Sequence, residues 1–255
     1  MKYNQLIIYY RLAFCLIILF FLHLTQVARA QLKFDIETGI IATGYNDVRI
    51  PGSTGTLVSL SDELNSNPNI FSRVNVGYRF KQGHEILALY APLNINYKGS
   101  VDRDVIFQGE TYPANSSLNA TYKFNSYRLT YRYHLIDNNC FDIGVGLSLK
   151  VRDALIGFRS GIMESEKTDL GIVPLINFSV HWKPTERIGM ILNGDALAAP
   201  QGRAEDVLLA VTFKGTENLT LKAGYRILEG GADNATVYTF SLFHYGVLGV
   251  IIRLE

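Results

Sequence analysis

Alternation between apolar and polar residues is the feature that most limits how this sequence can fold. The stretch NSYRLTYRYHL, at residues 125–135, sets one group of side chains against another: Tyr127, Leu129, Tyr131 and Tyr133 alternate with Ser126, Arg128, Thr130, Arg132 and His134. Successive side chains of a β-strand point to opposite faces, so this segment has an apolar face and a polar face. After residue 30 there is no run of 18 apolar residues and no sustained helical spacing. The sequence therefore predicts an all-β protein.

Residues 1–30 have the pattern of a secretory signal peptide. Lys2 and Arg11 precede an apolar run that extends from Leu12 to Leu24, and the small-x-small sequence 28–30 follows. The run is shorter than the roughly 20 residues that a membrane-spanning helix needs. We therefore expect cleavage near Ala30, which leaves residues 31–255 as one exported domain.

Composition excludes several classes of function. The sequence has 24 Lys and Arg against 23 Asp and Glu, and three of the basic residues lie in the expected signal, so the exported domain is slightly acidic. Such a domain lacks the basic surface of a nucleic-acid-binding protein. Cys140 is the one cysteine after residue 30, which excludes an intrachain disulfide and a cysteine-based zinc site.

The connections between the alternating segments predict the topology. We expect about ten strands, at residues 33–45, 70–80, 86–97, 119–134, 140–155, 168–182, 187–197, 206–213, 219–228 and 236–254. Short connections rich in turn formers, at 81–85, 136–139, 183–186 and 214–218, alternate with longer polar ones. All short turns then lie at one end of the sheet, as in an antiparallel up-and-down β-barrel with an even number of strands, for which eight or twelve are the alternatives. Residues 107–112 are expected to add a hairpin within one long loop.

Two kinds of barrel fit this alternation, and they differ in which face is outside. A soluble lipocalin-like carrier turns its apolar face inward, whereas a transmembrane barrel turns it toward lipid. Aromatic residues on the apolar face flank the short turns, as in the girdle of a membrane barrel: Phe80, Tyr133, Phe141, Trp182 and Phe213. The opposite facing would place Arg128 and Arg132 in lipid, at about 2–4 kcal/mol each near the midplane. The transmembrane barrel is therefore preferred, and the soluble carrier is kept as an alternative.

On these features the chain resembles bacterial outer-membrane β-barrel proteins over residues 31–255. The resemblance rests on the signal ending in ARA, the aromatic girdle, the loop asymmetry and the C-terminal segment LFHYGVLGVIIRLE. It implies the outer membrane of a Gram-negative-type bacterium, with outer-membrane lipid and the barrel-assembly machinery as partners. The family commonly ends on an aromatic residue, whereas this chain ends on Leu254 and Glu255.

Charged residues on the polar face are the candidate functional residues. We expect a lumen charge network formed by Arg128, Arg132, Lys150, Arg152, Asp195, Arg203, Glu205, Asp206 and Glu229. Charges with restricted access to water need partners, so mutual ion pairs are the preferred interpretation and a binding or selectivity site is the alternative.

The expected role is that of an integral outer-membrane protein with a structural, adhesive or narrow-pore function, and its solute or surface ligand is unknown. No residue pattern specifies a catalytic site, a metal site or a cofactor. The alternative is a protease or lipid-modifying enzyme with its site at the long-loop end. That hypothesis predicts that Asp195, Glu205 or Glu229 lies beside an open cleft.

Overall fold

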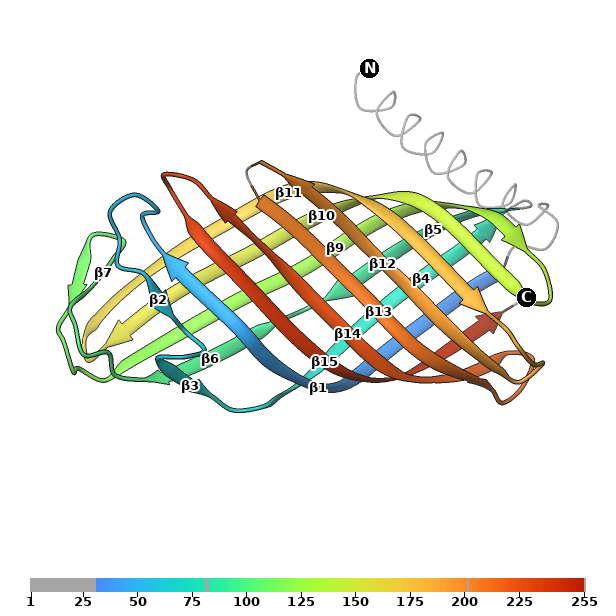
Figure 1. The fold of residues 1–255 in the computed structure, drawn as a ribbon, viewed down its shortest axis with the longest axis horizontal. Helices are drawn as coiled ribbons and strands as arrows, with labels where there is room; N and C mark the ends of the chain where they lie inside the picture. The colour runs from blue at the N-terminus through green and yellow to red at the C-terminus, as the bar shows by residue number, and fades with distance from the viewer. Residues whose placement is uncertain (1–30, 81–82, 201, 255) are drawn as a thin grey trace, which may run out of the picture.

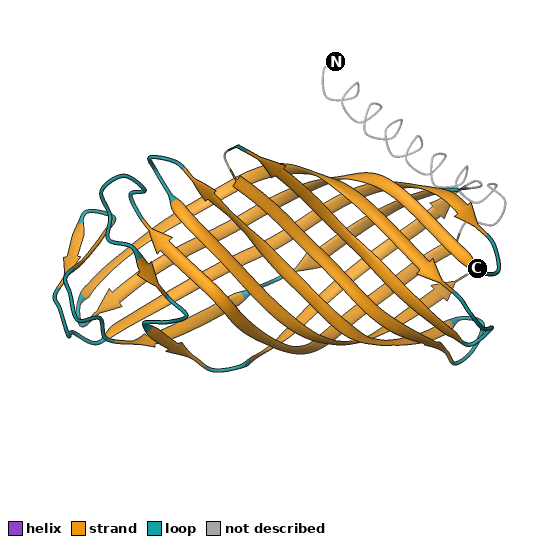
Figure 2. Ribbon diagram, viewed as in Figure 1, coloured by secondary structure: helices purple, strands orange, loops and turns teal. Residues whose placement is uncertain are grey.

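The computed structural model describes residues 31–80, 83–200 and 202–254. The expected signal peptide lies outside these residues. Every regular element in the described ranges is a β-strand (Figure 2). Those ranges hold no helix that is long and apolar enough to span a membrane.

Ten strand positions close into one antiparallel barrel, as the alternation predicts (Figure 1). In order around the wall they are β1 (Gln31–Arg49), β4 (Asn69–Phe80), β5 (His84–Ala91) continued by β6 (Asn94–Gly99), β9 (Leu118–Asp137), β10 (Phe141–Ser160), β11 (Met163–Trp182), β12 (Ile188–Ala199), β13 (Gly202–Lys214), β14 (Leu219–Asp233) and β15 (Tyr238–Leu254). Strands β15 and β1 pair along their whole length, which closes the wall. The break between β5 and β6 falls at Pro92, whose ring removes a backbone donor from the ladder.

Each expected strand is present, but several are longer at the long-loop end. Strand β10 continues to Ser160 and β11 begins at Met163. In these extensions polar residues such as Glu164 and Glu166 occupy outer positions. Polar side chains on both faces remove the alternation on which the sequence-based boundaries rest, while the backbone ladder between β10 and β11 continues unbroken.

The apolar face of the wall points outward. On β10, Leu147 is 69% exposed whereas Ser148 is 1% exposed. The predicted girdle residues lie on this outer surface at the short-turn end, where Phe141 pairs with Trp182 and Tyr133 pairs with His84. This is the facing of a membrane barrel and the opposite of a lipocalin-like carrier.

Two long loops fold over one side of the lumen at the long-loop end, and we call them the cap. One contains β2 (Val58–Ser59) and β3 (Leu64–Ser66), and the other contains the hairpin of β7 (Val105–Phe107) and β8 (Glu110–Tyr112) that was expected within this loop. The rings of Phe107 and Phe158 stack with centroids 4.4 Å apart. The cap is thus fastened to the inner wall of β10 by apolar contacts.

Candidate functional site: the lumen

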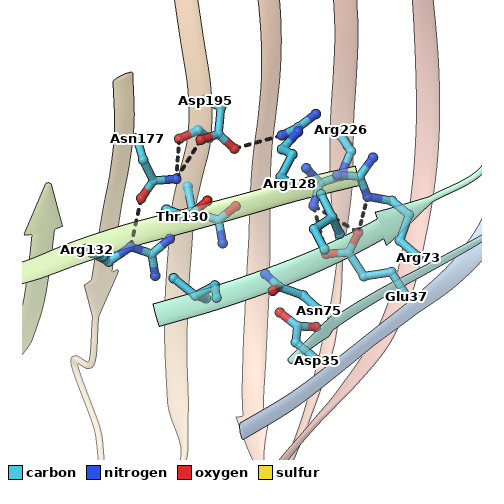
Figure 3. A pocket seen from close by; sticks show the side chains of 14 residues that line it. Asp35, Glu37, Arg73, Asn75, Arg128, Thr130, Arg132, Asn177, Asp195 and Arg226 are labelled. Carbon is cyan, nitrogen blue, oxygen red and sulfur yellow. Dashed lines mark hydrogen bonds and ion pairs between the residues drawn. The ribbon is translucent and has the colours of Figure 1, made fainter. Parts of the chain in front are cut away.

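Charged side chains fill the barrel at mid-height. They occupy inward positions of six strands, and we call them the mid-lumen network: Asp35, Glu37, Arg73, Arg128, Asp195, Asp206, Lys222 and Arg226. Figure 3 labels these residues except Asp206 and Lys222. Because alternate residues of a strand share a face, each of the six strands β1, β4, β9, β12, β13 and β14 supplies one or two charges to this level. Four carboxylates and four cations gather there.

Asp206 of β13 is the carboxylate of the network that is bonded to three guanidinium groups. It accepts hydrogen bonds from Arg73 at 2.8 Å, from Arg128 at 2.5 Å and from Arg226 at 2.5 Å. Its own exposed fraction is 2%. A charge this deeply buried is tolerable only with opposite charges in contact, and three guanidinium groups supply them.

Glu37 of β1 extends the network to the neighbouring strands. Arg226 donates to both of its carboxylate oxygens, at 2.8 and 2.9 Å, and Lys222 donates at 2.6 Å. Both Arg226 bonds come from one guanidinium nitrogen, Nη2, and all three bonds are charge-assisted, which makes them stronger than hydrogen bonds between neutral groups. Strands β1 and β14 are separated in the wall by β15, so these bonds cross the interior.

A second set of polar residues lies toward the short-turn end. Asn177 links the two sets, since its amide nitrogen donates to Asp195 at 2.9 Å and its oxygen accepts from Arg132 at 2.9 Å. Glu85 then accepts from Lys33 at 2.5 Å and from Arg132 at 3.2 Å. The lumen is therefore filled by linked hydrogen bonds from mid-height toward the short-turn end.

Little free space remains at this level. The cavity among the network side chains has a volume of about 50 Å³. A buried water needs on the order of 10–15 Å³ of such space, so this void suits a few waters rather than a passing solute. Ion pairs thus seal the described barrel at mid-height.

Above the seal, on the long-loop side, lies a much larger cavity, which we call the vestibule. Its volume is about 620 Å³, and apolar side chains such as Ile156, Val173 and Phe243 contribute to its lining. Tyr122 and Ser241 form a 3.0 Å hydrogen bond in its wall. Arg152 pairs with Asp169 at its edge. Lys150 lies in the lining as well, 3% exposed.

The structure divides the nine residues of the expected charge network into three groups. Arg128, Asp195 and Asp206 belong to the mid-lumen network, and Arg132 joins it through Asn177. Lys150 and Arg152 line the vestibule, as just described.

The third group lies on the outer phase of the wall, although Arg203 and Glu229 also belong to the lining of the vestibule. Arg203 and Glu205 alternate with Asp206 on β13, so they face away from the lumen. Glu229 likewise alternates with buried Leu228. Arg203 pairs with Glu229, which also accepts a 2.5 Å hydrogen bond from Tyr45.

Sequence reasoning missed five of the eight residues of the mid-lumen network, namely Asp35, Glu37, Arg73, Lys222 and Arg226. The signal was present, because each is a charged residue on the inward phase of an alternating strand. The sequence-based prediction of the network instead gave weight to charged residues near strand ends. It therefore included the outer residues Arg203, Glu205 and Glu229.

The carboxylates on which the enzyme hypothesis depends are mostly occupied. Asp195 accepts hydrogen bonds from Arg128, Asn177 and Ser148. Glu229 is held by Arg203 and Tyr45. Glu205 has no hydrogen-bond or ion-pair partner among the described residues, and it faces outward beside Ala196. Neither Asp195 nor Glu229 is therefore free to activate a water molecule in this arrangement.

Comparison with known proteins concerns the fold. No protein-family model and no curated protein matches the sequence. The outer-membrane protease OmpT from Escherichia coli is similar in structure, with a TM-score of 0.58 and 9% sequence identity over 90% of this chain and 100% of that chain.

Two further solved structures have lower TM-scores. The attachment invasion locus protein Ail of Yersinia pestis has a TM-score of 0.41 at 11% identity, over 88% of this chain and 99% of that chain. Neisserial surface protein A has a TM-score of 0.34 at 16% identity, over 88% and 97%. At such identities the likeness to OmpT bears on architecture alone. The chain has the fold of a bacterial outer-membrane β-barrel protein.

Proposed function

We propose that this protein is an outer-membrane barrel that does not conduct solutes and that binds a small, largely apolar molecule in its vestibule. The observation that supports the proposal most directly is the position of the mid-lumen network immediately below a cavity of about 620 Å³. Ligand sites commonly have volumes of roughly 300–1,000 Å³ with mostly apolar linings and a few polar groups. A structural or adhesive role does not by itself account for such a cavity.

The charge network favours a closed barrel over a narrow pore. Opening a path at mid-height requires Asp206 to part from Arg73, Arg128 or Arg226, all of which are buried. Breaking one partner out of a buried ion pair costs about 3–5 kcal/mol. A permanent pore needs charges that face water rather than each other, so a binding function above the seal fits the interior better.

Binding of a neutral probe tests the proposal. Protein in phosphatidylcholine nanodiscs is titrated with radiolabelled dodecan-1-ol, and uptake by empty nanodiscs is subtracted. We expect one saturable site per chain. Ala154→Trp should remove it, because Ala154 lines the vestibule and indole fills the space.

The matched control is Ala223→Trp, at an exposed outer position of β14. This variant places the same side chain in lipid and should keep the saturable site. Absence of saturable uptake by the wild type would overturn the proposed function. Equal binding by the wild type and Ala154→Trp would also overturn it.

A further inference from the structure

The barrel wall beside the vestibule is incomplete. Strands β11 and β12 pair from Trp182 and Met190 up to Ile176 and Ala196, and no pairing of the described residues continues beyond that point. In the ranges that the structure describes, β11 then extends to Met163 with β10 as its one ladder partner. Figure 1 shows the β12–β13 hairpin ending well short of the β10–β11 hairpin. The upper part of β11 therefore leaves a lateral gap in the wall.

Proline marks the place where the ladder ends. Pro174 lies two residues before Ile176 in the sequence, toward the long-loop end, and Ile176 is the last described residue of β11 that pairs with β12. Proline has no N–H group, so it is found on edge strands and disfavours a second ladder. The gap is thus encoded in the sequence of β11.

Apolar residues lie on both rims of the gap, on β11 and on β12. Leu170 and Ile172 on the outer face of β11 are 75% and 72% exposed. On the opposite rim, β12 ends in the small residues Ala198 and Ala199. Ile172 and Ala199 also belong to the lining of the vestibule. The cavity consequently reaches the gap beside the apolar outer face of β11, whereas Arg203 and Glu205 occupy the outer face of β13 beyond the other rim.

Lys150 is a buried cation without a counterion. Its side chain is in the vestibule lining and has no hydrogen-bond or ion-pair partner among the described residues. Its Nζ lies over the ring of Phe124, 4.4 Å from the ring centroid. Its cross-strand neighbour is Arg128, which carries the same charge and is already paired with Asp195 and Asp206. Like charges directly opposite each other in a sheet repel.

We infer that the vestibule binds a single-chain amphiphile with an anionic head group, with the head at Lys150, and that this ligand enters from the lipid through the gap between β11 and β12. The inference rests on the proposed function, since it names the class of ligand for the same cavity. A carboxylate at Lys150 supplies the missing opposite charge, and the apolar lining accepts the alkyl chain. Arg152 and Lys123, which also belong to the lining, are paired with Asp169 and Asp153. Lys167 has no such partner among the described residues but is partly exposed, so Lys150 is the lining cation in the described ranges that is both buried and unpaired.

Two probes with the same chain test the head-group assignment. Carboxyl-¹³C-labelled dodecanoate and dodecan-1-ol are titrated into the protein in nanodiscs. Lys150→Met should weaken dodecanoate binding by about tenfold or more, as expected for loss of a charge-assisted hydrogen bond. The same change should leave dodecan-1-ol binding unchanged or tighter. Lys98→Met, which removes an exposed lysine of β6 outside the cavity, should alter neither.

The outcomes separate this inference from the proposed function. If neither probe binds saturably to the wild type, both fail. If both probes bind and Lys150→Met weakens dodecanoate no more than Lys98→Met does, the anionic ligand is refuted and the binding vestibule stands. Folding of each variant is checked by heat-dependent gel mobility. Lys150→Met should fold, since it removes an uncompensated charge.

A bulky label tests the route. In a Cys140→Ser background, Ala198→Cys at the gap and Ala223→Cys elsewhere on the outer wall are modified with a large maleimide. If the ligand enters from the lipid, dodecanoate should associate more slowly with the protein labelled at residue 198, and the label at residue 223 should leave the association rate unchanged. Equal association rates for the two labels would refute lateral entry and point to entry from water past the loops.

Discussion

Arg128 of β9 and Asp195 of β12 form a 2.7 Å ion pair across the lumen, although β10 and β11 separate their strands in the wall. Both side chains are nearly inaccessible, at 2% and 10% exposure. Such a bond connects strands that share no backbone ladder. The ion pairs of the lumen therefore connect the strands in addition to the backbone ladders, and they close the barrel at mid-height.

Loss of Asp206 should destabilise the barrel strongly. Asp206→Ala leaves Arg73, Arg128 and Arg226 without their common acceptor in a region closed to water. We expect the free energy of unfolding to fall by about 3–5 kcal/mol. Urea unfolding of the refolded protein in lipid vesicles measures this change.

Asp233→Ala is the control for that experiment, because Asp233 is exposed at the end of β14. Its effect should stay within about 0.5 kcal/mol, as for most surface changes. Equal losses for the two variants would contradict a stabilising role of the mid-lumen network.

An arginine on the outer face should disturb assembly. Leu147 is at the centre of the apolar outer band of β10 and lies between Tyr131 and Ile176 in the wall. Leu147→Arg should lower the free energy of unfolding by about 2–4 kcal/mol, the cost of arginine near the bilayer midplane. Leu147→Phe keeps an apolar side chain there and should fold normally. The folded fraction of each variant, measured by gel mobility, tests whether residue 147 faces lipid. Equal folded fractions of the two variants would show that it does not.

Acid should loosen the contact between the two cap loops. Arg103 donates to Glu63 at 2.5 and 3.1 Å and to the Leu57 carbonyl at 2.7 Å. The hydrogen bonds from Arg103 hold the pKa of Glu63 below its ordinary value of 4.5. The pair thus stabilises the cap above pH 4.5, and its contribution is lost as the pH falls through the lowered pKa.

A nitroxide at Thr54→Cys, in a Cys140→Ser background, reports this change. Its mobility should stay constant at neutral pH and rise in acid, whereas Glu63→Gln should show raised mobility with little pH dependence in that range. The ion pair is partly exposed, so the effect should be roughly 1 kcal/mol or less. Identical pH profiles for the two proteins would show that Glu63 does not hold the loops together.

Period-two alternation predicted the barrel because it reports a physical boundary. A wall with lipid on one side and a polar lumen on the other requires an apolar side chain at Leu147 and a polar one at Ser148. The same alternation of apolar outward and polar inward residues recurs on the other strands of the barrel. Connection lengths supplied the rest of the topology. The boundary fades where β10 and β11 extend beyond the apolar band, and there the sequence-based limits were too short.

The site was less predictable than the fold. Alternation shows that Arg128 and Asp195 both face inward, but their depth depends on the register of all the strands between them. A one-residue difference in phase separates Asp206 in the lumen from Glu205 outside it. The lateral gap is likewise hard to predict from one strand, because Pro174 only marks where a ladder can end and the gap also requires two neighbouring hairpins of unequal length.

Single-channel recording tests the central claim most directly. The purified, refolded protein is inserted into a planar bilayer at two salt concentrations, and fluorescent label on the exposed Cys140 verifies insertion. A lumen sealed by Asp206, Glu37 and their cations predicts no discrete conductance at either concentration. Stepwise currents that scale with salt in the wild-type protein would show an open passage and contradict the seal.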